Sequence, residues 1–495
     1  MITNVNDFLE KSVKKFPNKI AFEELDKSIS YKDFNETSKK VASKIIDIIN
    51  CDFQRGVLII LPKGIDCLLS FFGVVKSGNF YTLLDKKTPK QRIEQVIEIL
   101  KPKLLITFKD FPYSFDLPTI FTQDFKDYDI NEEGLKLAKQ RHIDTNLLYV
   151  FFTSGSTGIP KGVSIAHKSV IDYTFWVCET FKISKKDSFL NQSPFYFDNS
   201  ILDIFSSIKM GACLHIVPTS LFAFPNKILQ YIEDKRISTI FWVPSVLIYF
   251  ANTNALNYFK LKSLKRVLFA AEIMPNKQLN IWRKFLPRTL FANLYGPTEL
   301  TDICCYYVVD REFKDDELLP IGKACKNVGL LVFDEDYKLI TKPFVKGELL
   351  VRGTSLSLGY YNDEKRSKEA FIQNPLHNNF LDLCYKTGDI VAYNERGELL
   401  CYGRKDFQIK FMGHRIELGE IEIMLSSHHD IKNSACIFKN DCIYGFYESS
   451  KELNLKYFLR DKLPIYMIPR QFIRVEKFSL NANSKIDKKA LNELV

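Results

Sequence analysis

The chain has 495 residues, of which 46% are hydrophobic and 26% are charged. This composition is ordinary for a globular protein, and the length exceeds what one hydrophobic core supports, so at least two domains are expected. The net charge of +10 comes from 69 basic and 59 acidic residues spread along the chain. A nucleic-acid-binding protein would concentrate such an excess in one patch, so no nucleic-acid partner is expected.

The first residues, MITNVNDFLEKS, lack the basic and apolar regions of a signal peptide, and no apolar run is long enough to span a membrane. Eleven cysteines without regular spacing indicate buried thiols in a reducing compartment, and no CxxC pair indicates zinc binding or redox exchange. The sequence therefore predicts a soluble, cytoplasmic protein without a membrane partner.

Helices and short apolar strands alternate along the first 300 residues. After Thr37, an apolar stripe of Ala42, Ile45, Ile46 and Ile49 predicts an amphipathic helix, and residues 56–61 (GVLIIL) then read as a buried strand. Residues 266–271 and 289–294 are further strands that lead into polar loops. Such alternation favours parallel sheets covered by helices, with ligands at the carboxyl ends of the strands.

The pattern changes after about residue 320. Residues 328–333, 347–351 and 390–402 indicate antiparallel strands, the last with a turn at residues 394–397, and a polar stretch begins at residue 403. The prediction is an α/β protein whose large N-terminal domain, residues 1–403, holds parallel and mixed sheets covered by helices plus a small barrel-like part. A small, mobile α+β domain would follow over residues 404–495.

Residues 153–162 (TSGSTGIPKG) carry the strongest chemical signal. They follow an apolar, strand-like run, and their small side chains leave backbone N–H groups and hydroxyls open beside Lys161. Such a loop suits a polyphosphate. The spacing is neither that of a Walker A loop, because Gly162 follows the lysine, nor that of a GxGxxG turn. By composition alone, the segment is equally typical of a surface turn.

The string TSGSTGIPKG resembles the phosphate loop of the adenylate-forming enzymes: acyl-CoA synthetases, luciferases and the adenylation domains of nonribosomal peptide synthetases. Further motifs of that family follow in its order along nearly the whole chain. They are YKDF (31–34), VKSG (75–78), NLYGPTE (293–299), GEL (347–349) with GY (359–360), YKTGD (385–389), GRKD (403–406) and NSKID (483–487).

The resemblance implies ATP and Mg²⁺ as cofactors. Thr298 would hydrogen-bond the α-phosphate and Glu299 would hold Mg²⁺, a cation that favours carboxylate and phosphate oxygens. Tyr295 would lie against adenine and Asp389 would bind the ribose hydroxyls, although a lone Glu or a turn Asp is otherwise an ordinary surface residue. The implied nucleotide-binding residues are Thr153, Ser154, Gly155, Ser156, Thr157, Gly158, Lys161, Ala271, Glu272, Asn293, Tyr295, Gly296, Asp389 and Arg404.

Lys485 corresponds to the family lysine that enters the active site from the C-terminal domain. Its charge would lie between the substrate carboxylate and the α-phosphate, and its loss would cost on the order of 3 kcal/mol of barrier stabilisation. Because a carboxylic acid is already ionised at neutral pH, no general base is required. Asp406 matches the family's hinge, about which the small domain would rotate for a second half-reaction with a thiol.

The segment containing Asp198 resembles the part of amino-acid-activating members that keeps an aspartate for the substrate ammonium. An unpaired buried ammonium is costly, so Asp198 favours an amino-acid substrate over a fatty or aromatic acid. By position, the remaining pocket residues are Asn199, Leu202, Phe241, Leu268, Ala270, Leu294, Asp302 and Ile303. Most are apolar, which indicates a small or medium side chain, and Asp302 is the exception.

The chain ends soon after Lys485 without a phosphopantetheine site, so a separate carrier protein is the expected partner. The prediction is a stand-alone adenylation enzyme that loads an amino acid onto a carrier protein in natural-product biosynthesis. A D-alanine:carrier protein ligase, a carboxylate-CoA ligase and a nucleotide-binding pseudoenzyme are the alternatives. The identity of the amino acid stays open.

Overall fold

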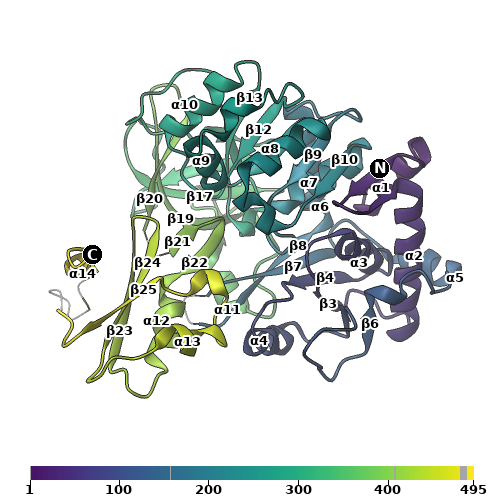
Figure 1. Cartoon of the computed structure of the whole chain (residues 1–495), viewed down its shortest axis with the longest axis horizontal. Coiled ribbons are helices and arrows are strands. Elements are labelled where there is room, and N and C mark those ends of the chain that lie inside the picture. The colour runs from purple at the N-terminus through teal and green to yellow at the C-terminus, as the bar shows by residue number, and fades with distance from the viewer. Residues whose placement is uncertain (1, 156–157, 406–407, 480–485, 487) are drawn as a thin grey trace. The chain divides into compact units, whose positions relative to one another are not determined.

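The computed structural model describes residues 2–155, 158–405, 408–479, 486 and 488–495 (Figure 1). The predicted roles of Ser156, Thr157, Asp406 and Lys485 therefore lie outside the described residues. The chain forms two compact units, the first made of Met1–Asp85, Pro102–Phe151 and Val163–Lys405, the second of Lys86–Lys101, Phe152–Gly162 and Asp406–Val495. Because the second unit includes two earlier segments, the division into residues 1–403 and 404–495 remains a proposal.

The largest sheet of the first unit has nine strands. In order they are β15 (Lys323–Ala324), β14 (Cys305–Val308), β13 (Leu290–Tyr295), β12 (Arg266–Phe269), β11 (Thr239–Trp242), β9 (Ser188–Asn191), β10 (Cys213–Ile216), β1 (Ile20–Glu23) and β2 (Ser28–Ser30). The strands from β13 to β1 run parallel, and the outer pairings are antiparallel. Between successive strands lie α6 (His167–Thr180), α7 (Ser200–Met210), α8 (Pro225–Asp234), α9 (Pro244–Asn252) and α10 (Asn276–Phe285) (Figure 1).

A second sheet has the order β6 (Thr119–Phe121), β5 (Leu104–Thr107), β3 (Gly56–Ile60), β4 (Phe80–Leu84), β7 (Leu147–Thr153) and β8 (Lys161–Ala166), with parallel pairing from β6 to β7. The other helices of the first unit are α1 (Asn6–Lys15), α2 (Tyr31–Ile48), α3 (Ile65–Lys76), α5 (Glu132–Arg141), α11 (Glu364–Ala370) and the short η1 (Thr122–Asp124), η2 (Thr219–Ala223), η3 (Ala255–Tyr258) and η4 (Thr298–Leu300).

Helix α2 begins earlier than the periodicity predicted. Its N-cap is Ser30, whose backbone is extended and whose hydroxyl accepts a hydrogen bond from the Asp33 N–H, so Thr37 lies inside the helix. The apolar stripe was correctly located, because α2 buries Ala42, Ile45 and Ile46. The start was wrong, because several Ser and Thr residues upstream of the stripe are chemically able to cap a helix.

The third sheet is antiparallel and contains β16 (Val328–Phe333), β17 (Gly347–Gly353), β19 (Leu383–Tyr393) and β18 (Phe371–Gln373), with β20 (Leu399–Arg404) paired to β19. The predicted 390–402 segment is thus the end of β19, the turn at residues 394–397 and the start of β20. The predicted α/β class is confirmed: a large part with parallel and mixed sheets and helices, plus this half-barrel sheet.

The second unit contains two small sheets. They are formed by β21 (Gln408–Phe411) with β22 (His414–Glu417), and by β23 (Asn433–Lys439), β24 (Cys442–Glu448) and β25 (Gln471–Val475). Its helices are α4 (Lys90–Leu100), α12 (Leu418–Ser426), α13 (Leu455–Arg460), η5 (Ile465–Met467) and α14 (Lys488–Asn492). Arg92 of α4 and Glu420 of α12 form a buried ion pair at 2.8 Å.

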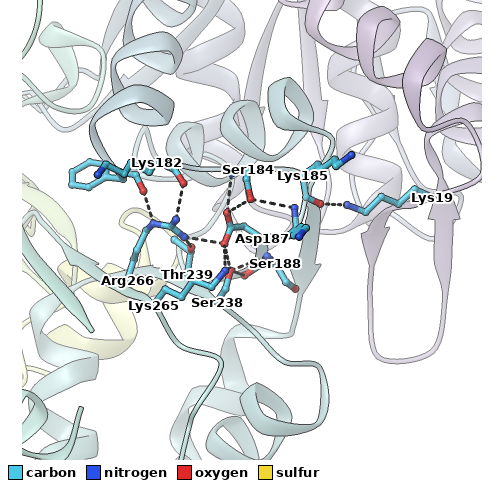
Figure 2. A network of polar contacts seen from close by, with 12 residues as sticks. Lys19, Lys182, Ser184, Lys185, Asp187, Ser188, Ser238, Thr239, Lys265 and Arg266 are labelled. Atoms are coloured by element: carbon cyan, nitrogen blue, oxygen red, sulfur yellow. Dashed lines mark hydrogen bonds and ion pairs between the residues drawn. The ribbon is translucent and has the colours of Figure 1, made fainter. Parts of the chain in front are cut away.

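A polar network joins the amino ends of β9, β11 and β12 (Figure 2). Asp187, which immediately precedes β9, accepts hydrogen bonds from the Ser238 hydroxyl at 2.9 Å and from the Arg266 guanidinium at 3.0 Å. Burial favours a higher pKa for Asp187, but these donors and the guanidinium charge outweigh it and lower the pKa to about 2. The network therefore stabilises the sheet at the edge opposite the carboxyl ends of these strands.

All eleven cysteines are free, and eight of them are buried, as the spacing predicted. Among the described residues, every helix is too short or too polar to cross a bilayer.

Candidate active site

Four adjacent strands bring most of the predicted site residues to one edge of the large sheet. In the sheet order β13-β12-β11-β9 all four strands run parallel, so their carboxyl ends meet at the same edge. The segment with Asp198 follows β9, Ala270 and Glu272 follow β12, and Glu299 follows β13. Residues more than 90 positions apart in sequence therefore converge where parallel sheets commonly bind ligands.

Glu299 lies in η4 and is fully buried. The Tyr360 hydroxyl donates a hydrogen bond to its Oε1 at 2.8 Å, and Thr298 precedes it half-buried. The Tyr360 hydroxyl thus fixes the orientation of the Glu299 carboxyl group. Its oxygen atoms are the donor type that Mg²⁺ prefers when phosphates complete the coordination, so the residue fits the predicted ion.

Asp389 is held from two sides within the first unit. The Tyr295 hydroxyl donates to Asp389 Oδ2, and the Arg404 guanidinium lies 3.2 Å from Oδ1. The position is set by the sheet, because Asp389 of β19 pairs in register with Arg404 of β20. Burial, followed by the charge of Asp389, raises the pKa of Tyr295, so its phenol stays protonated and continues to donate.

The other predicted nucleotide-binding residues of the first unit hold loops at the same edge. Glu272 accepts a hydrogen bond from the Ser245 N–H at 2.8 Å, at the start of α9, and Asn293 donates to the Pro320 carbonyl at 2.8 Å. Ala271 adopts a left-handed backbone with φ of 78°, a conformation that favours glycine.

Gly296 allows two backbone segments to approach closely. A Cβ at this position would lie 2.1 Å from the Asp302 carbonyl oxygen and 2.8 Å from the Ile303 Cα. These contacts are to backbone atoms, which cannot rotate away. Only glycine therefore lets the 295–299 turn pack against the segment that carries Asp302.

The predicted apolar pocket residues form part of one buried cluster. Each is at most 2% exposed: Leu202, Phe241, Leu268, Ala270, Leu294 and Ile303. Asp198 is buried beside the start of α7, and its Oδ1 accepts a hydrogen bond from the backbone N–H of half-buried Asn199 at 3.1 Å. The fold thus places an acidic group at the border of an apolar cluster.

Asp302 is a buried acid next to this cluster, with 1% of its surface exposed. The Tyr173 hydroxyl donates to its Oδ2 at 2.5 Å. Burial and then the charge of Asp198 raise the pKa of Asp302 well above its ordinary value. Neither Tyr173 nor the Tyr360 that contacts Glu299 was predicted to be a site residue; Tyr360 was noted as part of a motif, whereas Tyr173 gives no sequence signal.

The phosphate-loop residues belong to the second unit. The Ser154 hydroxyl donates to the Arg415 carbonyl at 2.8 Å and accepts from the Glu417 N–H at 3.2 Å. Thr153 ends β7, and its buried hydroxyl has no hydrogen-bond partner among the described residues. Gly155 and Gly158 are buried, Gly158 has φ of 77°, and Lys161 begins β8.

The model of the AMP-binding enzyme family matches residues 9–361, and the chain belongs to this family. It is 32% identical to zwittermicin A synthase ZmaJ of Bacillus cereus, over 99% of this chain and 95% of that protein. It is 31% identical to a D-alanine--D-alanyl carrier protein ligase of Bacillus cytotoxicus, over 98% of each.

A solved structure with the same fold is NpsA-ThdA, an artificially fused adenylation-PCP di-domain NRPS from Klebsiella oxytoca. It matches with a TM-score of 0.81 and 21% identity, over 96% of this chain and 94% of that one. Several other matched peptide synthases are much longer, and the chain spans only 6–10% of each. The chain is therefore an adenylate-forming ligase related both to adenylation domains and to D-alanine:carrier protein ligases.

Proposed function

We propose that the protein activates an amino acid with ATP and then transfers it to the phosphopantetheine thiol of a separate carrier protein. In the first step a substrate carboxylate oxygen bonds to the α-phosphorus of ATP and the bond to pyrophosphate breaks, which gives aminoacyl-AMP. In the second step the thiol attacks the acyl carbon, AMP leaves, and the thiol proton passes to solvent.

The observation that carries the choice of an amino acid is the buried carboxyl group of Asp198 at the carboxyl edge of the sheet. A fatty or aromatic acid carries no ammonium and could not form this ion pair, whereas a buried carboxylate is stabilised by a cationic partner. An amino acid offers its ammonium to Asp198 while the neighbouring apolar cluster receives its side chain.

The contacts of the first unit support the proposed nucleotide-binding roles. Asp389, oriented by Tyr295 and Arg404, is suited to accept hydrogen bonds from ribose hydroxyls. Glu299 would hold Mg²⁺, which supplies positive charge to the phosphate oxygens when bound. Thr298 and the 153–161 loop would contact the phosphates. Lys485 would stabilise the transition state, and Asp406 would act as the hinge.

A D-alanine:carrier protein ligase is the second candidate, favoured by the full-length similarity to such an enzyme. Pyrophosphate exchange tests both candidates with a panel of L-amino acids, D-alanine and simple carboxylic acids. Exchange with an L-amino acid supports the main proposal, and exchange restricted to D-alanine supports the second. A response only to acids without an amine would refute both candidates and favour the carboxylate-CoA ligase alternative.

A further inference from the structure

Three side chains of different chemistry lie together on the large sheet, and none of them belongs to the site described above. Glu23 ends strand β1, and Cys213 and His215 lie on the neighbouring strand β10. A carboxylate oxygen, the thiol sulfur and a ring nitrogen of these residues all lie within 4.8 Å of one another. Because Glu23 is far from the other two in sequence, no motif marks the cluster.

The strand register holds the three side chains on one face of the sheet. Parallel pairing places Glu23 of β1 next to His215 of β10, and Cys213 lies two positions before His215, so its side chain shares that face. The opposite face is apolar, because Phe22 and Leu214 are paired in register and belong to the main core cluster. The backbone therefore gathers the three polar groups before any ion is bound.

The Glu23 carboxylate presents its two oxygens to different neighbours. Its Oε1 pairs with the Lys235 ammonium at 2.5 Å, whereas its Oε2 lies 3.8 Å from Nδ1 of His215. The Lys235 side chain is 41% exposed, so it holds one oxygen while the other remains directed towards the imidazole.

The His215 imidazole is held in place within the sheet, and the thiol is reachable. The Tyr231 hydroxyl of helix α8 lies 3.0 Å from His215 Nδ1, and the two rings contact each other edge to face. His215 is 3% exposed, whereas Cys213 is a free, half-buried thiol. Neighbours that orient a ligand in this way are typical of metal sites.

The set of ligand atoms suits Zn²⁺. Zinc lies about 2.0–2.2 Å from nitrogen and oxygen ligands and about 2.3 Å from sulfur, so two ligands of one tetrahedral ion are about 3.4–3.6 Å apart. Small side-chain rotations bring the cluster to these separations. Mg²⁺ and Ca²⁺ bind almost exclusively through oxygen, so a thiol and an imidazole do not suit them.

A second group of potential ligands, residues 428–430, is less well built. Its members are consecutive in the chain, the His429 side chain is 84% exposed, and Asp430 pairs with the Lys451 ammonium at 3.0 Å. Exposed groups of this kind gain little from the fold, because nothing else fixes their positions.

We propose that Glu23, Cys213 and His215 bind a Zn²⁺ ion that links β1 to β10. On binding, the thiol proton passes to solvent, and the thiolate and the carboxylate balance the charge of the ion. A water molecule takes the fourth position, beside the Tyr231 hydroxyl. This site is separate from the Mg²⁺ that Glu299 would hold, and the inference does not depend on the proposed function.

Equilibrium dialysis of the full-length chain against Zn²⁺, after removal of any affinity tag and treatment with EDTA, measures the site directly. The protein should retain about one Zn²⁺ per chain in excess Mg²⁺, because Mg²⁺ does not compete for sulfur and nitrogen ligands. With Co²⁺ in place of Zn²⁺, the near-ultraviolet charge-transfer absorption of a thiolate–cobalt bond should appear.

The variants assign the ligands. Cys213→Ser and His215→Gln should each weaken Zn²⁺ binding about a hundredfold or more, and Cys213→Ser should also abolish the cobalt absorption. Cys51→Ser is the matched control, because Cys51 is an exposed free cysteine and its loss should change neither result. Zn²⁺ should raise the unfolding temperature of the wild type and of Cys51→Ser, but not of Cys213→Ser. Tryptophan fluorescence verifies the folding of each variant.

Three results would overturn the proposal. They are the absence of the thiolate–cobalt absorption in the wild type, its persistence in Cys213→Ser, and Zn²⁺ binding that His429→Gln abolishes while His215→Gln leaves it intact. The last result would place the ion in the exposed group at residues 428–430.

Discussion

Replacing Asp187 with alanine should destabilise the first unit strongly. Asp187 is 2% exposed, and its carboxylate lies 3.0 Å from the Arg266 guanidinium, whose side chain is 9% exposed. Asp187→Ala would leave that guanidinium buried with only the Phe181 and Lys182 carbonyls and the Thr239 hydroxyl as acceptors. Removing one partner of a buried ion pair costs about 3–5 kcal/mol.

Urea denaturation followed by tryptophan fluorescence measures this loss. All three tryptophans, Trp176, Trp242 and Trp282, are buried in the first unit, so the signal reports on that unit. A double-mutant cycle with Arg266→Met should give a coupling free energy of about 1–3 kcal/mol. Exposed Asp234 provides the control, because Asp234→Ala should change the free energy of unfolding by less than about 0.5 kcal/mol.

The pH dependence has a defined sign. The pKa of Asp187 is about 2 in the folded protein and 3.8 in its ordinary state, so its contribution to stability is complete above about pH 4. The difference in free energy of unfolding between the wild type and Asp187→Ala should therefore become smaller as the pH falls from 4 towards 2. If Asp187→Ala lowers the free energy of unfolding at pH 7 by less than about 1 kcal/mol, or if the coupling free energy between Asp187 and Arg266 is zero, the network has no stabilising role.

Three further predictions concern the active-site edge. Ala271→Gly should stabilise the protein by about 0.5–1 kcal/mol, because glycine adopts the left-handed backbone of this position without strain. Ala251→Gly in helix α9 is the control and should destabilise the protein by about 1 kcal/mol. Urea denaturation measures both changes in the free energy of unfolding, and two changes of the same sign would contradict backbone strain at Ala271. Gly296→Ala should displace Asp302 and lower kcat/KM in pyrophosphate exchange at least tenfold, and an unchanged value would show that the backbone yields. Lys485→Ala should slow adenylate formation about a hundredfold or more and largely spare thiol transfer from preformed adenylate, so equal loss in both steps would contradict the domain-rotation mechanism.

The amino-acid sequence was enough to predict the class of fold and the neighbourhood of the site. The apolar runs 56–61 and 266–271 contain strands β3 (Gly56–Ile60) and β12 (Arg266–Phe269), because burial of a strand depends on local hydrophobicity. Alternation with helices then leads to parallel pairing. Parallel pairing then places the residues after β9, β12 and β13 at one edge. The family motifs were recognisable because their spacing is a local property of the chain.

The partners of the functional side chains were decided by tertiary structure. Tyr173 lies 129 residues from Asp302 and Tyr360 lies 61 residues from Glu299, so no local pattern connects either pair. The same holds for Asp187 and Arg266, which are 79 residues apart and meet only because β9, β11 and β12 are neighbours. Hydrophobic periodicity records which residues are buried, whereas a hydrogen bond depends on which buried side chains the packed strands and helices bring within 3 Å.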